Sequence, residues 1–581
     1  MQDKVAPQLL NSFAGPNFAS ALKSILLNSR HEWQYCFLDR GGDATERYFS
    51  AAQLLNSAEQ IARRLVAITP PQSAVILAME HGADFLICLL AAIFAQRTVI
   101  PAPLPRFGAH IQRFCAIAQL CDQAFILTTQ HNADPIKKAL QQAHLTATGR
   151  LLSLETITSG LNGEDNGADN EDYQVELPGF ATDPKTPIVI QFTSGSTSSP
   201  KGVLISSENI LANQHEVSSR WHFHPDKIVL NWLPYYHDMG LFGGLLYPLL
   251  GGLRVVQMDP LHFIQKPQRW LFAMSKFKVN ISGGPAFSYS LCTELDLTTQ
   301  PKKIDLSHWQ IAFCGADYVP ADSIKQFCSL YSAYGFQSSA MMPVYGLAEA
   351  TLFVAGQPNI KVNHPPEYTE NKTMGCYLGG AQQPNIYIRH VKSGDVLSPG
   401  DIGEICFSGA SVTQGYYQQQ MNHQQQMNLQ PEMNLSHGML KSGDLGFIKD
   451  DYLFICGRLK DIIISHGQNI SAAAIEQTAA SLSTELNPHA TAVFQLSPPG
   501  NEIVLLMEVN KSLKGRIKNK HNLRSDIIAL VMQRLGVRLS DVVFLKRGEL
   551  MKTSSGKVQR QLVAEHFRLG HLFKEADHDN S

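Results

Sequence analysis

The stretch TSGSTSSPKG, residues 193–202, decides how this chain is interpreted. It follows the apolar run at 188–192, so the order predicts a buried strand that opens into a loop rich in hydrogen-bond donors. Glycine lets the backbone approach a ligand, and successive N–H groups with hydroxyls can surround phosphate oxygens. The spacing is not that of a Walker A loop. Standing alone, the stretch would be interpreted as an ordinary Ser/Gly surface turn.

Size and composition favour a large enzyme. A chain of 581 residues exceeds what one hydrophobic core organises, so two or more domains are expected. Hydrophobic residues make up 44% and charged residues 17%, which is typical of a well-buried globular protein. Lys and Arg number 48 against 50 Asp and Glu, so no broad nucleic-acid surface and no nucleic-acid partner is expected.

The cysteines and the apolar segments indicate where in the cell the protein is expected to work. The ten cysteines are scattered singly without a C-x-x-C pair, which is typical of reduced thiols in a cytoplasmic protein. The N-terminus lacks a signal-peptide pattern. The most apolar segments, 85–95 and 241–256, are short or interrupted. We therefore expect a soluble, cytoplasmic protein without a transmembrane segment.

The N-terminal part alternates helical and extended patterns. Apolar spacing predicts a helix over Ala51–Ile68 and a second over 82–94, with strands at 73–79 and 99–105. This alternation indicates α/β layering around a parallel sheet. The acidic segment 161–174 is predicted to be an exposed connection.

The C-terminal part is organised differently. Residues 395–409 predict a hairpin with 396–400 at its turn, and the Gln/Asn/Met-rich tract 418–434 predicts a surface stretch. A smaller unit follows 457–461, with strands near 490–495 and 502–509 and a helix at 523–535. We divide the chain into a large domain (1–456), a hinge (457–461) and a small domain (462–581).

Five further clusters carry polar groups that core packing does not require: 232–240, 314–317, 345–351, 441–446 and 552–560. In the first, His237 and Asp238 have a plain alternative as a helix cap. In the third, Tyr345 offers a face for a base, and Glu349 offers a carboxylate for Mg²⁺. Asp444 suits the two hydroxyls of a ribose, and 552–560 is a basic loop suited to anions.

The ordered set of motifs resembles a known family. TSGSTSSPKG, YGLAE, SGD, GRLKD and KTSSGK occur in the order seen in adenylate-forming enzymes, which include acyl-CoA synthetases, luciferases and nonribosomal adenylation domains. The resemblance covers about residues 50–565. It is closest to fatty acyl-AMP ligases, on the phrases QFTSGST (191–197), LPYYHDMGL (233–241) and GLAEATLF (346–353).

The resemblance implies a fold. We expect a large N-terminal domain of layered α/β subdomains plus a β-barrel-like subdomain, followed by a small, mobile α+β domain. The polar segment 353–374 has no sustained periodicity and is long for a loop in a compact enzyme. The resemblance implies that it is the insertion of fatty acyl-AMP ligases, which packs on the large domain and limits movement of the small one.

The resemblance also assigns roles. ATP and Mg²⁺ are the expected cofactors, and a fatty acid and the phosphopantetheine arm of an acyl carrier protein are the expected partners. The catalytic candidates are Lys557, Glu349 and His237, and Glu349 is also the metal ligand. The nucleotide-binding candidates are Thr193, Ser194, Gly195, Ser196, Thr197, Lys201, Gly315, Ala316, Tyr345, Gly346, Asp444 and Arg458. The hinge residue is Lys460, and the acyl-pocket residues are Met239, Gly283, Gly284 and Phe287.

Departures and rivals complete the interpretation. Met551, Ser471 and Asp450-Asp451 differ from residues common in the family, and none replaces a proposed catalytic group. A fatty acyl-CoA synthetase would share the adenylation step and use coenzyme A as acceptor. A non-catalytic adenylate-binding protein would keep the fold, but the set Glu349, Asp444 and Lys557 argues against it.

Overall fold

The computed structural model of the chain describes most of its residues. These are 18–38, 45–106, 108–146, 149–159, 175–179, 183–193, 200–296, 304–316, 319–358, 366–368, 373–379, 385–417, 435–436, 439–465, 468–483, 486–496, 502–509, 520–546, 548–552 and 557–572. The predicted segments 161–174 and 418–434 therefore lie outside the described residues, together with Ser194, Gly195, Ser196 and Thr197.

The first sheet has seven strands in the order β21-β8-β7-β4-β3-β5-β6. Their bounds are β3 Ala74–Leu77, β4 Thr98–Pro101, β5 Phe125–Thr128, β6 Leu151–Ser153, β7 Pro187–Thr193, β8 Lys201–Ser206 and β21 Tyr416–Tyr417. The pairs among β7, β4, β3, β5 and β6 are parallel, whereas β8 is antiparallel to both β7 and β21. Parallel strands covered on both faces read as continuous apolar runs, as β3 and β5 do here.

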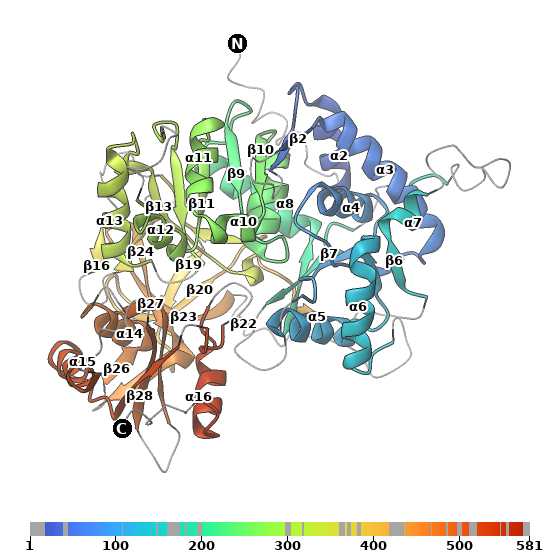
Figure 1. The fold of residues 1–581 in the computed structure, drawn as a ribbon. Helices are drawn as coiled ribbons and strands as arrows, with labels where there is room; N and C mark the ends of the chain where they lie inside the picture. The colour runs from blue at the N-terminus through green and yellow to red at the C-terminus, as the bar shows by residue number, and fades with distance from the viewer. Residues whose placement is uncertain are drawn as a thin grey trace.

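Helices flank this sheet (Figure 1). They are α3 Ala51–Ile68, α4 Ala83–Phe94, α5 Gly108–Leu120, α6 Gln130–Gln142, α7 Leu154–Thr158 and α8 Ser207–Arg220. Helix α3 begins at a capping box, because the Ser50 side chain accepts from the Gln53 N–H and the Gln53 side chain accepts from the Ser50 N–H. The helices predicted at Ala51–Ile68 and 82–94 are confirmed.

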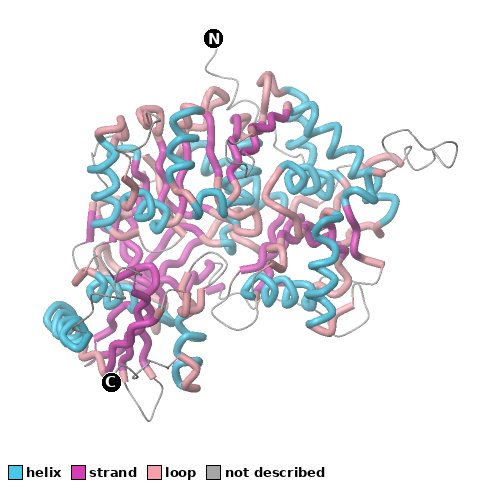
Figure 2. Tube along the Cα trace, viewed as in Figure 1, coloured by secondary structure: helices cyan, strands magenta, loops and turns pink. Residues whose placement is uncertain are grey.

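A second seven-stranded sheet has the order β13-β12-β11-β9-β10-β1-β2. Its strands are β1 Tyr35–Leu38, β2 Glu46–Phe49, β9 Ile228–Asn231, β10 Arg254–Met258, β11 Ile281–Gly284, β12 Ile311–Cys314 and β13 Met341–Pro343. Its helices are α2 Phe18–Asn28, α9 Tyr247–Leu250, α10 Pro260–Gln265, α11 Gln268–Lys276, α12 Ala286–Thr293 and α13 Ala321–Ser332. A π-helix, η2 Met239–Leu246, leads into α9. Figure 2 shows the strands of both sheets in magenta among the cyan helices.

A third sheet has the order β18-β24-β23-β20-β19, with β22 paired to β23. Its strands are β18 Cys376–Tyr377, β19 Ile386–Arg389, β20 Gly403–Phe407, β22 Leu435–Ser436, β23 Met439–Lys449 and β24 Tyr452–Arg458. The described strands form an open path from β18 to β19, so the barrel-like shape stays a prediction. Four short strands, β14 Tyr345–Gly346, β15 Phe353–Ala355, β16 Glu367–Tyr368 and β17 Thr373–Met374, pair as β14-β15 and β16-β17. Three 3-10 turns complete this part: η3 Ser338–Ala340, η4 Ala348–Ala350 and η5 Leu459–Asp461.

The predicted hairpin at 395–409 is wrong in its first arm. The partner of β20 is β19, so the two arms flank residues 390–402. The chain turns first at 390–395, where Gly394 has a φ of +77°, and Val396 then bridges back to Arg389. A tight turn with glycine in the left-handed region explains why pairing begins earlier than the sequence predicts.

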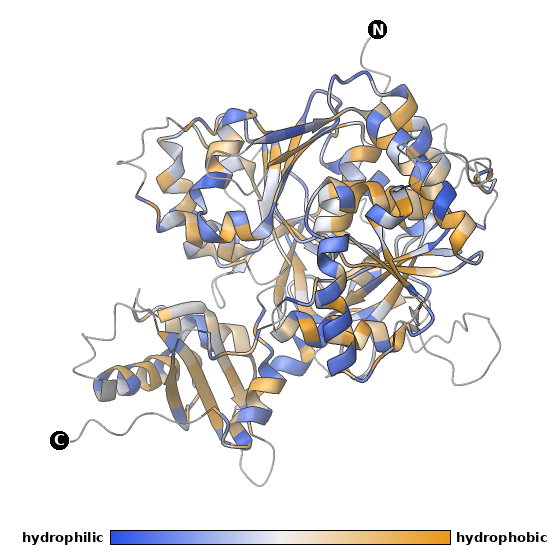
Figure 3. Ribbon diagram, turned by 45° about the vertical axis from the view of Figure 1, so that its right-hand side comes forward, coloured by the Kyte–Doolittle hydropathy of each residue, from blue (hydrophilic) through white to orange (hydrophobic). Residues whose placement is uncertain are grey.

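The C-terminal elements form their own lobe, visible below the two large sheets in Figure 1 and at the lower left of Figure 3. The strands are β25 Ile462–Ser465, β26 Gln468–Ser471, β27 Leu486–Gln495, β28 Ile503–Val509 and β29 Asp541–Leu545, and the helices are α14 Ala472–Ala480, α15 Lys520–Leu535 and α16 Arg560–Arg568. The two apolar clusters around the β27-β28-β29 sheet contain only residues from 463 onward. The predicted strands and helix of this unit are confirmed, and the boundary at 457–461 stays a prediction.

Two further observations concern the whole described chain. None of the ten cysteines, all of which lie in the described part of the chain, forms a disulfide, and nine of them are buried. Among the described residues, every helix is too short or too polar to cross a bilayer. The layered α/β class predicted from the sequence is confirmed.

One polar side chain ties α8 to the loop before β21, and its removal tests this part of the fold. Asn209 completes a capping box with Ser206, and its Nδ2 donates to the carbonyls of Ala410 and Val412 at 2.7 and 3.0 Å. Because Asn209→Ala removes the capping box and both of these partly buried hydrogen bonds, we expect the free energy of unfolding to fall by about 2 kcal/mol in urea titrations.

The exposed Ser219 on the same helix supplies the control. Ser219→Ala should change the free energy of unfolding by less than about 0.5 kcal/mol. Equal urea midpoints for the two variants would contradict this description of Asn209.

Candidate active site

The strands β7 and β8 hold the two ends of the glycine- and hydroxyl-rich loop. Thr193 pairs with Lys201 in the antiparallel register, and the Thr193 hydroxyl donates to the Lys201 carbonyl at 3.4 Å. The predicted residues Ser194, Gly195, Ser196 and Thr197 lie between these ends, outside the described residues. The closed base of the loop agrees with a strand that opens into a phosphate-binding turn.

Tyr416, on β21, joins the loop to the carboxylate candidate. Its hydroxyl donates to Glu349 Oε1 at 2.8 Å, and the Lys201 ammonium lies 5.2 Å from the centre of its ring. The neighbouring Thr413 N–H donates to the Glu349 carbonyl at 2.9 Å. Sequence analysis missed Tyr416, because it lies between Gly415 and the Gln-rich tract and belongs to no motif.

Gly315 and Gly346 lie where the backbone leaves no room for a side chain. A Cβ on Gly346 would meet the Leu352 carbonyl oxygen at 1.8 Å, and one on Gly315 would meet the Val344 carbonyl oxygen at 2.5 Å. Ala316 follows with a φ of +68°, a conformation that costs free energy for a residue with a Cβ. The protein's own backbone therefore fills the space beside both glycines, so only glycine fits at these two positions.

Asp444 is the centre of a buried polar cluster. Its Oδ2 accepts from the Tyr345 hydroxyl at 2.8 Å, and its Oδ1 lies 3.1 Å from Arg458 Nε. The pairing of β23 with β24 places Asp444 opposite Arg458. Burial, followed by the Asp444 charge, raises the pKa of Tyr345 well above its usual value. Tyr345 is 8% exposed, so it supports Asp444 as well as bordering the expected base site.

The His237-Asp238 turn precedes the π-helix. Asp238 Oδ1 accepts from the Met239 N–H at 2.8 Å, so the capping alternative is confirmed for Asp238. Burial, with the charges of Arg113 and Lys557, lowers the pKa of His237 well below its usual value. Burial raises the pKa of Asp238, and the Lys557 ammonium opposes that rise. Lys557 therefore lies within electrostatic range of this turn, although it comes from the C-terminal lobe.

Three side contacts hold this turn against the end of β7. Gln191 Nε2 donates to the Tyr236 carbonyl at 2.8 Å, and Arg113 Nη2 donates to the Phe192 carbonyl at 2.7 Å. Arg113 also lies 5.7 Å from the centre of the Tyr236 ring. The His237 turn and the end of β7 are thus neighbours, although more than forty residues separate them in the sequence.

The hinge candidate Lys460 lies in the 3-10 turn η5 Leu459–Asp461. Burial lowers its pKa, and Arg458 adds to the effect, whereas Asp461 and Asp444 oppose it. Lys460 is therefore close to the Asp444 cluster. No structural observation here tests its role as a pivot, so that role stays a prediction.

Two of the four acyl-pocket candidates, Gly284 and Phe287, lie against the buried indole of Trp232. Met239 and Phe287 pack on the apolar cluster that contains Trp232, and the rings of Phe287 and Trp232 are 6.0 Å apart. A Cβ on Gly284 would meet Trp232 Cζ2 at 2.5 Å, and one on Gly283 would meet the Phe313 carbonyl oxygen at 2.0 Å. The structure thus brings these residues together around an apolar wall.

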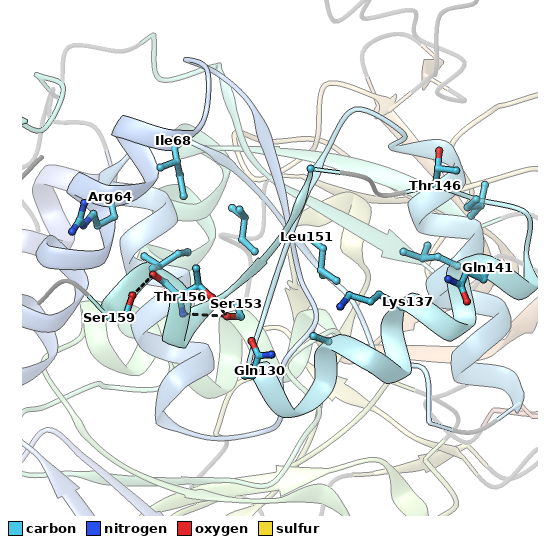
Figure 4. Close-up of a pocket in the computed structure, with 16 residues that line it drawn as sticks. Arg64, Ile68, Gln130, Lys137, Gln141, Thr146, Leu151, Ser153, Thr156 and Ser159 are labelled. Atoms are coloured by element: carbon cyan, nitrogen blue, oxygen red, sulfur yellow. Dashed lines mark hydrogen bonds between the residues drawn. The ribbon is translucent and has the colours of Figure 1, made fainter.

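A separate groove of about 720 Å³ lies elsewhere on the large domain (Figure 4). It is lined by α3, α6, β6 and α7, with Arg64, Lys137 and Gln141 among its polar side chains. Strand β6 is at the opposite edge of the first sheet from β21 and β8. The groove shares no residue with the candidates above and is not part of this site.

Comparisons with known proteins agree with this geometry. Residues 31–417 match the model of a family described as AMP-binding enzyme. Because that match covers more than half of the chain, the protein belongs to the AMP-binding enzyme family. The resemblance to adenylate-forming enzymes is confirmed.

Three similar proteins indicate which members of the family this chain resembles. The chain is 28% identical to a medium-chain-fatty-acid–[acyl-carrier-protein] ligase, TtuA, of Teredinibacter turnerae, over 91% of this chain and 90% of that one. It is 27% identical to a putative fatty-acid–CoA ligase, fadD21, of Mycobacterium bovis, over 86% and 88%. A structure from a study of fatty acyl-adenylate ligases of E. coli and L. pneumophila matches with a TM-score of 0.81 and 26% identity, over 96% and 99%. The resemblance to fatty acyl-AMP ligases is confirmed.

The lowered pKa of His237 predicts how the stability of the protein depends on pH. The folded chain depresses its pKa, so between a pH of about 6.5 and the lower folded value the unfolded chain binds the proton more readily. The stability that neutral His237 contributes is therefore complete above about pH 6.5 and falls as the pH drops below it. The fall cannot exceed about 1.4 kcal/mol per pH unit for one group.

The free energy of unfolding can be measured in urea at several pH values between about 7.5 and 5, around the usual histidine pKa of about 6.5. As the pH falls, His237→Gln should lose less of this free energy than the wild type does. His131→Gln, at an exposed position on α6, should keep the wild-type slope. A wild-type slope in His237→Gln would show that His237 titrates as it does in water.

Proposed function

We propose that this enzyme activates a fatty acid with ATP and transfers the acyl group to the phosphopantetheine thiol of an acyl carrier protein. The observation that carries the proposal is the geometry around Glu349, whose Oε1 accepts from the Tyr416 hydroxyl while the Lys201 ammonium lies over the same ring. Lys557, from the C-terminal lobe, also helps to lower the pKa of His237. The similar proteins named above are a fatty-acid–[acyl-carrier-protein] ligase, a putative fatty-acid–CoA ligase and a protein from a study of fatty acyl-adenylate ligases. We also propose that the enzyme works in the cytoplasm.

The chemistry is a nucleotidyl transfer. An oxygen of the fatty carboxylate forms a bond to the α-phosphorus, and the bond from that phosphorus to the pyrophosphate oxygen breaks. Negative charge grows on the α-phosphate and on the leaving pyrophosphate, so the protein must align the reactants and neutralise charge. Lys201, Thr193 and the loop residues Ser194, Ser196 and Thr197 are the groups we assign to the β- and γ-phosphates.

Magnesium fits the donor set as an ion held mainly by the substrate. Mg²⁺ in such sites uses one or two carboxylates, several waters and the phosphates. Glu349 offers one carboxylate, whose Oε1 is oriented by Tyr416. The described residues contain no group of three His, Cys, Asp or Glu that could form an all-protein site. When bound, the ion would neutralise phosphate charge as the pyrophosphate leaves.

The nucleoside is assigned to two neighbouring features. Asp444 already accepts from Tyr345 and pairs with Arg458, which holds both of its oxygens in fixed directions. A carboxylate oxygen accepts more than one hydrogen bond, so Asp444 can also receive the two ribose hydroxyls. We assign the adenine ring to the backbone of Gly315, Ala316 and Gly346.

The acyl chain is assigned to the wall around Trp232. Each methylene that Met239, Gly283, Gly284 and Phe287 remove from water stabilises binding by about 0.8 kcal/mol. His237 is buried and neutral, so it adds no charge at the passage between the acyl and phosphate sites. A neutral imidazole there agrees with a gating role rather than a charge contact.

The acceptor follows from the segment 353–374. Its described residues 367–374 contact α13 and the two residues before it: Lys325 pairs with Glu367, Met374 N donates to the Val319 carbonyl at 3.2 Å, and Thr373 bridges Pro320. Residues 359–365 and 369–372 lie outside the described residues. These contacts support the interpretation of 353–374 as an insertion that restricts the small domain and favours a carrier protein over coenzyme A.

Removal of the Lys557 charge tests the adenylation step. We expect Lys557→Ala to slow fatty-acid-dependent pyrophosphate exchange by about 10²–10³-fold, because one transition-state charge contact is lost. Lys546→Ala removes an exposed lysine of the same lobe and should leave the rate unchanged. Wild-type exchange in Lys557→Ala would refute the assignment of Lys557.

The acceptor is tested with the two thiols in parallel. Purified enzyme with ATP and a fatty acid should form acylated carrier protein when given a phosphopantetheinylated carrier, with little acyl-CoA when given coenzyme A. Rapid formation of acyl-CoA would favour the alternative that the protein is a fatty acyl-CoA synthetase. Absence of any fatty-acid-dependent exchange would favour a non-catalytic adenylate-binding protein.

A further inference from the structure

The chain segment that carries Lys557 is closed at its base. Lys552 and Val558 form an antiparallel bridge, and the Gln559 N–H donates to the Met551 carbonyl at 2.9 Å. Residues 553–556 between these arms lie outside the described residues. Lys557 is next to the closing pair, so the two arms at 548–552 and 558–560 determine where its side chain starts.

A buried glutamate holds the first arm. Glu508 on β28 is 3% exposed, and its Oε1 accepts from the N–H groups of Gly548 and Leu550, both at 2.9 Å. Its Oε2 is 3.6 Å from the Lys552 ammonium. The first arm is therefore fixed to the small-domain sheet by one carboxylate that contacts three of its residues.

A second buried glutamate holds the other arm through Arg560. Arg560 begins α16, three residues after Lys557. Its Nε and Nη2 donate to the two oxygens of Glu476 at 2.7 and 2.6 Å, which is the bidentate geometry that fixes a guanidinium in direction. Glu476, on α14, is 5% exposed, and its Oε1 also accepts from the Val493 N–H at 2.9 Å.

The same guanidinium reaches the hinge. Arg560 Nη1 donates to Asp461 Oδ2 at 3.0 Å, and Asp461 directly follows Lys460. One side chain thus joins three places: the C-terminal arm of the lysine segment, the core of the small domain, and the residue after the predicted pivot. Lysine could not replace it, because an ammonium has no planar fork to satisfy two carboxylates in fixed directions.

We propose that Arg560 is a positioning residue for Lys557. By holding Glu476 and Asp461 together, it makes the lysine segment rigid with the hinge end of the small domain, so a rotation at Lys460 delivers the ammonium to one place. The inference rests on the proposed role of Lys557 in adenylation. Arg560 touches no substrate in this proposal. It affects the adenylation step and leaves the transfer of the acyl group to the carrier thiol unchanged.

The test compares the two half-reactions. Arg560→Lys keeps the charge and loses the fork, so fatty-acid-dependent pyrophosphate exchange should slow by about 10- to 100-fold, the scale of a small misplacement of a reacting group. The KM for ATP should stay unchanged. Transfer from supplied acyl-adenylate to the carrier thiol, which needs no adenylation, should also stay unchanged. Arg568→Lys, at an exposed position on the same helix, is the matched control.

A second variant covers the case in which Arg560→Lys folds poorly. Asp461→Ala removes the acceptor of Arg560 Nη1 at the hinge and leaves Glu476 and Arg560 paired, so it should slow exchange to a smaller extent and spare the transfer step. Arg560→Lys combined with Lys557→Ala should be no slower than Lys557→Ala alone, because a residue that acts through Lys557 has nothing left to position.

The outcomes separate the two proposals. Equal slowing of exchange and transfer in the Arg560 and Asp461 variants, or a double variant slower than Lys557→Ala, overturns the positioning role and leaves the function intact. Wild-type exchange in Lys557→Ala overturns the adenylation role of Lys557 and the positioning role with it. Selective loss of exchange without additivity supports both.

Discussion

The electrostatic influence of Lys557 on the His237-Asp238 turn is the interaction on which the rest of the proposed site depends. It crosses from the C-terminal lobe to the large domain, whose apolar clusters are separate. A cation brought in this way can be present for one step and absent for another, which a residue of the large domain cannot achieve. The separate core of the small lobe is the physical requirement for that arrangement, because only a unit with its own core can turn as a body.

The turn that receives Lys557 is already biased toward anions. Arg113 lies beneath it, hydrogen-bonded to the Phe192 carbonyl, and burial lowers its pKa to about 10, so it remains charged at neutral pH. Its charge also helps to keep His237 neutral. Arg113 and Lys557 both act electrostatically on His237, and two positive charges near one turn agree with the proposed site for a carboxylate and a phosphate. The alkyl part of the same substrate would lie against the apolar wall around Trp232, where charge is absent.

The sequence predicts the parts of this protein that rest on local rules. Helix α3 follows from apolar spacing, and β7 follows from an apolar run that ends in glycine and hydroxyl residues. Tyr416 could not be predicted, because its value comes from the pairing of β21 with β8, which brings it to Lys201 and Glu349 across more than sixty residues. The hairpin at β19-β20 was misplaced for a similar reason: both 386–389 and 396–397 can extend, and only the turn at Gly394 decides which arm pairs with β20. Long-range pairing, rather than residue type, separates the predicted features from the missed ones.

Tyr416 shows why such a residue matters for charge. A lysine in direct contact with Glu349 would have much of its charge cancelled, and the carboxylate would be less able to hold a metal ion. The ring instead lies beneath the Lys201 ammonium while its hydroxyl orients Glu349, so both charged groups are held by one rigid side chain. A cation over an aromatic face keeps its full charge for a phosphate that approaches from the other side. The large domain thus holds Lys201 and Glu349 apart on the one side chain of Tyr416, whereas the third charge, Lys557, comes from the C-terminal lobe.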